Sequence, residues 1–237
     1  MSKIKLFCFP FAGGSAAAFN TWRTLLAKNI ELCNIELAGR GRRMREPLYK
    51  DIPDAVADVF DKIKEDLDKG PYALLGHSMG SVIAFELNYK IKENNLPGPV
   101  HIFFSGRGAP HMPTDNKKKY HLMPDDQFKE EMIALGGTAK EFFRIPELME
   151  VFLPVLKGDL KVNESYAYRE KPARLECDIT VLNGVKDQEV TPQEIDEWKI
   201  HSSGRCTIHN FPGDHFFIND EAAKITGIIN NTLTPLF

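Results

Sequence analysis

The strongest constraint on the fold of this chain is a short run at residues 76–80, which reads GHSMG. It follows an apolar stretch, Tyr72 to Leu75, and precedes a helix-like stretch, Ser81 to Ile91. A G-x-S-x-G run between a strand and a helix is typical of a turn so sharp that its central residue takes a strained backbone conformation. We therefore predict that Ser78 presents its hydroxyl at the edge of a sheet as a nucleophile. An ordinary glycine-rich turn is the alternative.

Strand-like and helix-like segments alternate along most of the chain. The predicted strands are Ile4 to Phe9, Glu31 to Glu36, Tyr72 to Leu75, Val100 to Ser105, Ile179 to Leu182 and Cys206 to Phe211. The predicted helices are Phe19 to Lys28, Ile52 to Leu67 with Asp51 as its cap, Ser81 to Ile91, and Asn219 to Leu233. This order predicts an α/β fold with a mostly parallel central sheet covered by helices on both faces.

The length and composition of the chain fit one folded unit. With 237 residues, of which 43% are hydrophobic, a single α/β domain spanning residues 1–237 can bury a sizeable core. The net charge of −3 favours neither nucleic acid nor an anionic membrane as a partner, and no apolar run has the length of a transmembrane helix. The apolar stretch at the N-terminus is too short for a signal peptide, so we expect a cytoplasmic protein.

The cysteines give no sign of a metal site. Cys8, Cys33, Cys177 and Cys206 are widely spaced, form no C-x-x-C pair and mostly fall in or beside strand-like runs. Such a pattern is typical of reduced, buried thiols in a cytosolic protein. We therefore expect no metal site.

The alternation breaks between His111 and Lys171, where short helix-like segments are separated by prolines and glycines. We predict a helical insertion here, at approximately residues 111–171, which covers the active site as a lid. Its apolar side chains at helical spacing are Phe128, Met132, Leu135, Phe142, Phe143, Ile145, Leu148, Met149, Phe152 and Leu153. They line an acyl-binding channel or form the small core of the insertion, and the sequence leaves both interpretations open.

A serine hydroxyl becomes a good nucleophile only when a base takes its proton and an acid orients that base. In α/β hydrolases both partners follow the serine along the chain. Of the seven histidines, only His209 and His215 lie late in the chain near a strand. His209 falls inside the predicted strand, whereas His215 lies in the loop that leaves it. We therefore predict His215 as the base.

The orienting acid is expected in the loop after the preceding strand. Asp187 occupies such a place, because the β-branched run Ile179 to Leu182 breaks at an Asn-Gly pair just before it. The carboxyl ends of the strands are where open α/β sheets gather their functional loops. We predict Asp187 as the acid. The rival carboxylates are Asp178, which precedes the strand, Glu189, and Asp214, which is too close in sequence to the base.

The same chemistry requires an oxyanion hole. In this fold one donor is the amide after the nucleophile, here Met79, and the other comes from the loop after an early strand. The loop after Ile4 to Phe9 reads PFAGGS, and its glycines permit close approach of a substrate to the backbone. We choose Ala12 as the second donor, with Phe11 as the alternative. A plain flexible turn would also explain the two glycines.

These segments together resemble one family. The matching runs are FPFAGG at 9–14, AGRGRR at 38–43, GHSMG at 76–80, LGGT at 135–138, FLP at 152–154 with Asp159 soon after, GVKD at 184–187 and GDH at 213–215. Over nearly its whole length the chain resembles a type II thioesterase, a stand-alone editing hydrolase that accompanies nonribosomal peptide and polyketide synthases. One departure is Ser81, where many relatives have another small residue such as glycine.

The resemblance implies an α/β-hydrolase fold with Ser78 as nucleophile, His215 as base and Asp187 as orienting acid, and it requires no cofactor. It also implies a substrate, an acyl thioester on the phosphopantetheine arm of an acyl or peptidyl carrier protein. Such carriers are usually acidic, so basic side chains could steer docking, with solvated loop charges as the alternative. The candidates are Arg40, Arg42, Arg43 and Arg45, and Lys117, Lys118 and Lys119.

Two rival functions stay open. A general carboxylesterase or lipase would use the same triad on oxoesters, and a binding protein without activity could keep the hydrolase scaffold. A preference for carrier-bound thioesters over oxoesters would distinguish a thioesterase from the esterase or lipase. Labelling of Ser78 by a reactive-serine probe would distinguish an enzyme from the binding protein.

Overall fold

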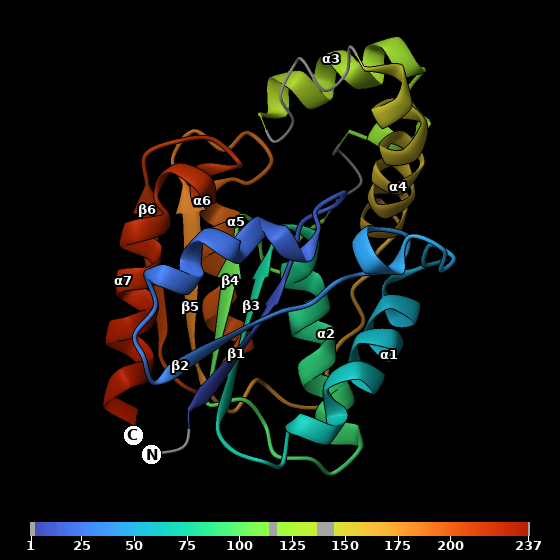
Figure 1. The fold of residues 1–237 in the computed structure, drawn as a ribbon. Coiled ribbons are helices and arrows are strands. Elements are labelled where there is room, and N and C mark those ends of the chain that lie inside the picture. Colours follow the sequence, from blue (N-terminus) through green and yellow to red (C-terminus); the bar gives the residue numbers. More distant parts are fainter. Residues whose placement is uncertain (1–2, 114–117, 137–144, 237) are drawn as a thin grey trace.

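The computed structural model describes residues 3–113, 118–136 and 145–236. Its strands form one sheet with the order β2-β1-β3-β4-β5-β6 (Figure 1). The strands are β1 Ile4–Phe9, β2 Ile30–Asn34, β3 Tyr72–His77, β4 His101–Ser105, β5 Asp178–Gly184 and β6 Cys206–Phe211. Every pairing between neighbours in this sheet is parallel. The predicted fold class is therefore confirmed.

Helices connect these strands. The longer ones are α1 Ile52–Ile63, α2 Met79–Glu93, α3 Asp125–Leu135, α4 Pro146–Glu164 and α7 Ala222–Leu233, and the short α-helices are α5 Pro192–Asp196 and α6 Phe217–Asp220. The 3-10 helices are η1 Ala16–Thr24, η2 Gly41–Arg43, η3 Lys64–Asp66, η4 Tyr120–Leu122, η6 Glu197–His201 and η7 Thr234–Leu236. None of these helices is long and apolar enough to cross a membrane.

Three helices differ from the sequence prediction in kind or extent. The helix expected at Ile52 to Leu67 is α1 followed by the 3-10 helix η3. The helix expected at Phe19 to Lys28 is the 3-10 helix η1, which begins earlier because the Ser15 side chain accepts the Ala17 N–H at 3.3 Å. The helix expected at Asn219 to Leu233 is divided into α6 and α7. The predicted cap of α1 is present, since the Asp51 carboxylate accepts the Asp54 N–H at 2.8 Å.

Two apolar cores lie on the two faces of the sheet. Along β1, Phe7 and Phe9 belong to one core while Leu6 and Cys8 belong to the other, as the alternation of side chains along a strand requires. The first core includes α1 and α2, and the second includes η1 and α7 (Figure 1). The sheet is thus covered on both faces, which explains why its strands are nearly continuous apolar runs.

The chain between β4 and β5 carries η4, α3 and α4, which extend beyond the end of the sheet toward which the strands point (Figure 1). A third apolar cluster joins these helices through Tyr120, Phe128, Met132, Leu156 and Leu160. Within the described part of this segment there is no strand, as the sequence predicts. The apolar positions Phe142 and Phe143 lie outside the described residues, and Ile145 and Leu148 are exposed.

Candidate active site

The backbone at Ser78 has the strained conformation that the motif predicts. Ser78 links β3 to α2 with φ 55° and ψ −115°. A Cβ added at Gly76 would lie 2.0 Å from the Gly80 carbonyl oxygen, and one added at Gly80 would lie 2.1 Å from the Phe9 carbonyl oxygen. Both obstacles are backbone atoms, so no side-chain movement can relieve them. The turn therefore needs glycine at both places.

Hydrogen bonds to neighbouring strands hold this turn. The Ser78 N–H donates to the Ser105 carbonyl at the end of β4 at 2.8 Å, and the Ser81 hydroxyl donates to the Gly76 carbonyl at 2.8 Å. Ser81 also accepts the Ser105 N–H at 3.1 Å. The residue that departs from the family pattern thus joins α2 to the ends of β3 and β4.

The structure brings the predicted base and acid into contact. His215, in the loop after β6, has its Nδ1 2.8 Å from Oδ2 of Asp187, in the loop after β5. Both residues are buried. The other carboxylate oxygen of Asp187 accepts the Glu189 N–H at 2.8 Å, which fixes the carboxylate plane. The pair has the arrangement by which an acid holds an imidazole in one orientation and tautomer.

The rival residues lie elsewhere. The Asp178 carboxylate accepts the Arg205 N–H at 2.7 Å at the start of β5, and Glu189 accepts the Tyr120 hydroxyl at 2.6 Å. Asp214 accepts the Phe216 N–H at 2.9 Å within its own loop. His209 is half-buried on β6, where it pairs with Leu182. The carboxylate that hydrogen-bonds His215 is thus that of Asp187.

A second buried histidine, which the sequence analysis did not single out, lies beside His215. The ring of His77 is centred 5.3 Å from that of His215, and its Nδ1 is 2.9 Å from the Ser105 hydroxyl. Burial, with a smaller contribution from His215, holds the pKa of His77 well below its ordinary value of 6.5. His77 is therefore a neutral ring packed against His215. Its place directly before the nucleophile in the motif is the only sequence signal for it.

Ser78 and His215 line one cavity of about 330 Å³. Its other walls come from the loop after β1, including Phe11 and Ala12, and from α3 and α4. The apolar side chains that α3 and α4 contribute are Met132, Leu135, Phe152, Leu156 and Leu160. Phe128 belongs instead to the core between the helices, with no exposed surface. Both interpretations of the apolar stripe therefore hold in part, because Phe128 lies in the core while Met132 belongs to both the core and the cavity wall, as do Leu156 and Leu160 of α4.

The amides that could bind an oxyanion are those of Met79, next to Ser78, and of the loop after β1. Met79 is the first residue of α2, and the N–H groups of a first helical turn have no acceptor within the helix. In the loop after β1, the Gly13 N–H donates to Asp159 at 2.7 Å and the Gly14 N–H donates to the Phe11 carbonyl at 2.9 Å. Those two amides are therefore engaged. Ala12 and its alternative Phe11 stay the candidates for the second oxyanion donor, as predicted from the sequence.

Two of the arginines considered for docking are held by carboxylates. Arg40 is 6% exposed and pairs with the buried Asp159, and Arg43 bonds Asp58 at 2.8 Å and Glu46. Neither side chain is free at the rim. Arg42 and Arg45 are exposed. Lys118 pairs with Glu131 at 2.6 Å, and Lys119 donates to the Glu164 carbonyl at 3.0 Å. Lys117 lies outside the described residues.

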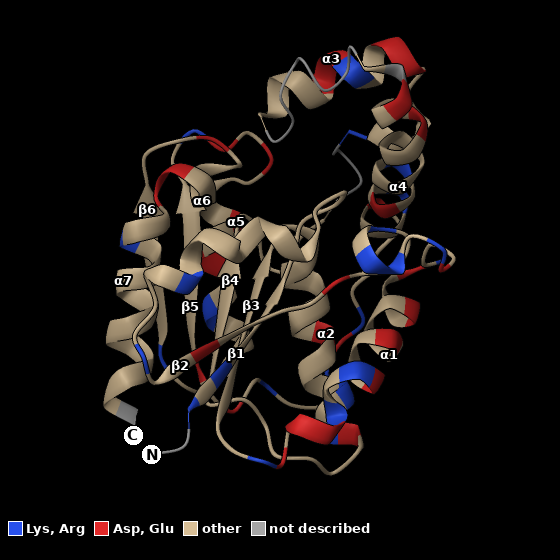
Figure 2. Cartoon of the chain, in the orientation of Figure 1, with Lys and Arg blue, Asp and Glu red and all other residues tan. Residues whose placement is uncertain are grey.

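The basic residues in the described ranges are interspersed with acidic ones (Figure 2). Figure 2 shows Lys and Arg beside Asp and Glu along α1, α4 and the segment after β2. A steering field needs an excess of one sign over a surface, and mixed charges cancel within a few ångströms. Charge in the described part of the chain thus gives little support to a strong docking patch.

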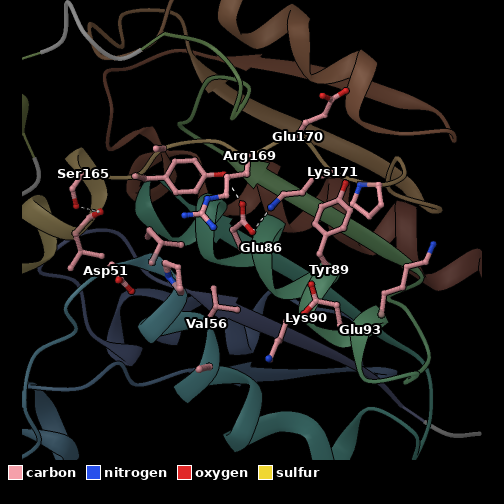
Figure 3. A pocket seen from close by; sticks show the side chains of 18 residues that line it. Asp51, Val56, Glu86, Tyr89, Lys90, Glu93, Ser165, Arg169, Glu170 and Lys171 are labelled. Atoms are coloured by element: carbon pink, nitrogen blue, oxygen red, sulfur yellow. Dashed lines mark hydrogen bonds and ion pairs between the residues drawn. The ribbon is translucent and has the colours of Figure 1, made fainter.

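A larger cavity, of about 680 Å³, lies apart from Ser78 and His215, between α1, α2 and the chain after α4 (Figure 3). One ion pair lies among its charged side chains. Glu86 pairs with Lys171 at 2.6 Å and accepts the Tyr166 hydroxyl at 2.7 Å. Neither Ser78 nor His215 lines it. Size alone would select this cavity, but the reactive side chains gather at the smaller one.

No group of three or more His, Cys, Asp or Glu side chains in the described ranges could hold a metal ion. The four cysteines are unpaired thiols. Burial raises the pKa of the Cys8 thiol well above its ordinary value and that of Cys33 to about 11, so both stay protonated near neutral pH.

Comparison with known proteins places this chain in a family. The family model of the thioesterase domain matches residues 4–233. The gramicidin S biosynthesis protein GrsT of Aneurinibacillus migulanus is 40% identical over 217 residues, which are 92% of this chain and 84% of GrsT.

Two solved structures are similar over almost their whole length. ClbQ from the colibactin NRPS/PKS pathway superposes with a TM-score of 0.94 at 37% identity, covering 99% of this chain and 98% of ClbQ. The type II thioesterase BorB from the borrelidin biosynthetic cluster gives 0.87 at 33% identity, covering 97% and 92%.

Proposed function

The chain belongs to the thioesterase family as a type II thioesterase, and from that premise we propose that it hydrolyses acyl thioesters held on the phosphopantetheine arm of carrier proteins. The observation that carries this proposal is that Ser78 and His215 line one cavity, with Asp187 bonded to His215. Ser78 after β3, Asp187 after β5 and His215 after β6 lie at the carboxyl ends of their strands, and Asp187 and His215 are 2.8 Å apart.

The residues have distinct roles in the proposed mechanism. Ser78 Oγ attacks the thioester carbonyl carbon while His215 Nε2 takes the hydroxyl proton. The C–S bond then breaks, the same proton passes to the departing thiol, and the acyl group remains on Ser78. Water repeats the sequence, giving its proton to His215 as it attacks. The carboxylic acid leaves and the serine hydroxyl is restored.

Asp187 and His77 act on the base from two sides. The Asp187 carboxylate holds Nδ1 and stabilises the imidazolium that forms when His215 takes a proton. His77 stays neutral beside it, since burial lowers its pKa. A second positive charge is thereby kept away from the imidazolium, which would otherwise be harder to form.

The oxyanion that forms at each step is stabilised by the amides of Met79 and Ala12. Such donors act strongly because they are fixed before the reaction begins and lie where water is excluded. The acyl chain extends into the cavity of about 330 Å³, along the apolar side chains of α3 and α4. These helices then serve as the lid of a single domain, and the pantetheine arm reaches Ser78 from outside.

The proposed role is editing, in which unwanted acyl groups are removed from carriers so that a synthase can resume. GrsT, ClbQ and BorB are each named for a biosynthetic pathway or cluster, which supports a carrier-bound substrate here. A synthase blocked by a short acyl group on its carrier and restored by this protein would support the role. A protein that clears its free carrier yet leaves the synthase blocked would oppose it.

The first experiment compares one short acyl group on a carrier protein, on coenzyme A and as an oxoester, with Ser78→Ala as the blank. We expect the highest kcat/KM for the carrier-bound thioester. Preference for the oxoester would make the protein an esterase. Equal rates for the wild type and Ser78→Ala, together with no labelling of Ser78 by a fluorophosphonate, would leave a binding protein on a hydrolase scaffold.

A further inference from the structure

A buried ion pair connects α4 to the loop after β1. Asp159 on α4 is 2% exposed, and its carboxylate bonds the Arg40 guanidinium at two places, with Oδ2 2.5 Å from Nη1 and Oδ1 2.8 Å from Nη2. Asp159 Oδ2 also accepts the Gly13 N–H at 2.7 Å. One carboxylate therefore joins three segments that are far apart in the sequence.

Arg40 has no donor left for any other partner. Besides the two bonds to Asp159, its Nη1 donates to the Gly14 carbonyl at 3.0 Å, and its Nε and Nη2 both donate to the Ala38 carbonyl at 3.1 Å. These bonds use all five N–H groups of a guanidinium. The Arg40 side chain thus links the loop after β1, the loop after β2 and helix α4, and all of its donors are occupied.

The loop held in this way is the one that carries the predicted oxyanion donor. Gly13 has φ +76°, and a Cβ added there would lie 2.8 Å from Leu156 Cδ1, so the loop also packs tightly on α4. The Gly13 N–H shares its peptide plane with the Ala12 carbonyl, so the bond to Asp159 fixes that plane and restricts, through the backbone angles of Ala12, how the adjoining plane with the Ala12 N–H can turn. A change of 1 Å in the position of a donor costs of the order of 10²-fold in rate.

We propose that Asp159 and Arg40 are positioning residues that set the oxyanion hole and make its geometry depend on the position of α4. This inference rests on the proposed function, since it concerns the hole of the same site. Neither side chain touches the substrate. When α4 lies as in this structure, Asp159 holds the Gly13 amide and the hole is formed. Movement of α4 away from the sheet withdraws the acceptor.

The test uses Asp159→Asn, which keeps the shape of the side chain and removes its charge. We expect kcat to fall about 10²- to 10³-fold, as when an oxyanion donor is lost, with KM within about threefold. A trifluoromethyl ketone analogue, which forms an oxyanion with the serine, should bind more weakly by a similar factor. A thioether analogue that lacks the carbonyl should bind as it does to the wild type.

Two further variants separate positioning from stability. The matched control is Asp58→Asn, which breaks the nearby Arg43 pair at 2.8 Å, and we expect its kcat to stay within about threefold of the wild type. The double variant Arg40→Met with Asp159→Leu replaces both charges by apolar groups, an exchange that is often neutral for stability. We expect its unfolding temperature to return toward that of the wild type while kcat stays low.

Each variant is assayed on the carrier-bound thioester and on a p-nitrophenyl ester. If the wild type hydrolyses only the p-nitrophenyl ester, the proposed substrate is overturned. The rates of the variants on that ester would still test the positioning role of Asp159 and Arg40. The inference is overturned if Asp159→Asn loses no more kcat than Asp58→Asn, or if the double variant recovers kcat together with stability. A wild type that hydrolyses neither ester overturns both.

Discussion

A buried histidine, His101, makes the unfolding free energy of this protein depend on pH, and replacing it should reduce that dependence. His101 begins β4, is 6% exposed, and has its Nε2 2.9 Å from the Thr180 hydroxyl. Burial lowers the pKa of His101 from 6.5 to about 4, against a smaller opposing effect of Asp178. In the unfolded chain the same ring has its ordinary pKa, because water surrounds it.

The sign and size of the effect follow from proton counting. Between pH 6.5 and about 4 the unfolded chain holds a proton on His101 that the folded protein lacks, so acid favours unfolding. One proton corresponds to a slope of about 1.4 kcal/mol per pH unit, and the whole shift corresponds to about 3 kcal/mol. Above pH 6.5 both states are neutral at this ring, so its effect on the pH dependence ends there.

The assay is urea unfolding, followed by circular dichroism, at intervals from about pH 7 to about pH 5. His101→Gln should reduce the slope of the unfolding free energy against pH by the amount that corresponds to about one bound proton, since glutamine does not titrate. Other groups that titrate in this range affect both proteins and cancel in the comparison. The matched control is Thr180→Val, which removes the hydrogen bond but leaves the histidine.

The control should shift stability at every pH and keep the slope of the wild type. Parallel curves for the wild type and His101→Gln would refute the reasoning, because they would mean that the buried ring takes up its proton as readily as an exposed one. A flattened curve for Thr180→Val would also count against it, since the slope would then follow the hydrogen bond and not the titrating group.

The remaining predictions concern the site. Ser78→Ala should lower kcat by about 10⁶ and Asp187→Asn by about 10⁴, whereas Asp214→Asn, next to the base in sequence but bonded within its own loop, should stay within about tenfold in the same steady-state assay. Gly76→Ala should destabilise the fold by about 3 kcal/mol or more in thermal unfolding, because its Cβ would lie 2.0 Å from a backbone oxygen, while Gly98→Ala, with no atom within 4 Å, should be tolerated. Met132→Trp should fill the cavity and lower kcat/KM for long acyl chains relative to short ones by about 10- to 100-fold, and unchanged chain-length preference would argue against the proposed acyl site.

Local patterns were enough to predict where the reactive side chains stand on the fold. The strand before Ser78 and the helix after it are visible as an apolar run and a helical stripe, and the glycines on either side report the tight turn. Asp187 and His215 were found because each follows a β-branched or alternating run, and parallel strands must end at a common edge. Errors occurred where local preference is weak, as in η1, whose start depends on a cap at Ser15.

The cluster of arginines shows the limit of that approach. A run of Arg at residues 40–45 resembles a solvated face, and nothing nearby in the sequence indicates otherwise. The partner that buries Arg40 is Asp159, which is 119 residues away. Only the packing of α4 against the loops after β1 and β2 brings the two charges together.

The sequence by itself therefore determined the parallel α/β architecture and the candidates Ser78, Asp187 and His215, because hydrophobic periodicity and turn chemistry are properties of neighbouring residues. Tertiary structure alone decided that Asp187 hydrogen-bonds His215, that Met132 lines the cavity as well as the core while Phe128 lies in the core, and that Arg40 holds a loop. These outcomes depend on distances between segments separated by tens of residues. Such distances are set by how helices pack on the sheet, which no local pattern encodes.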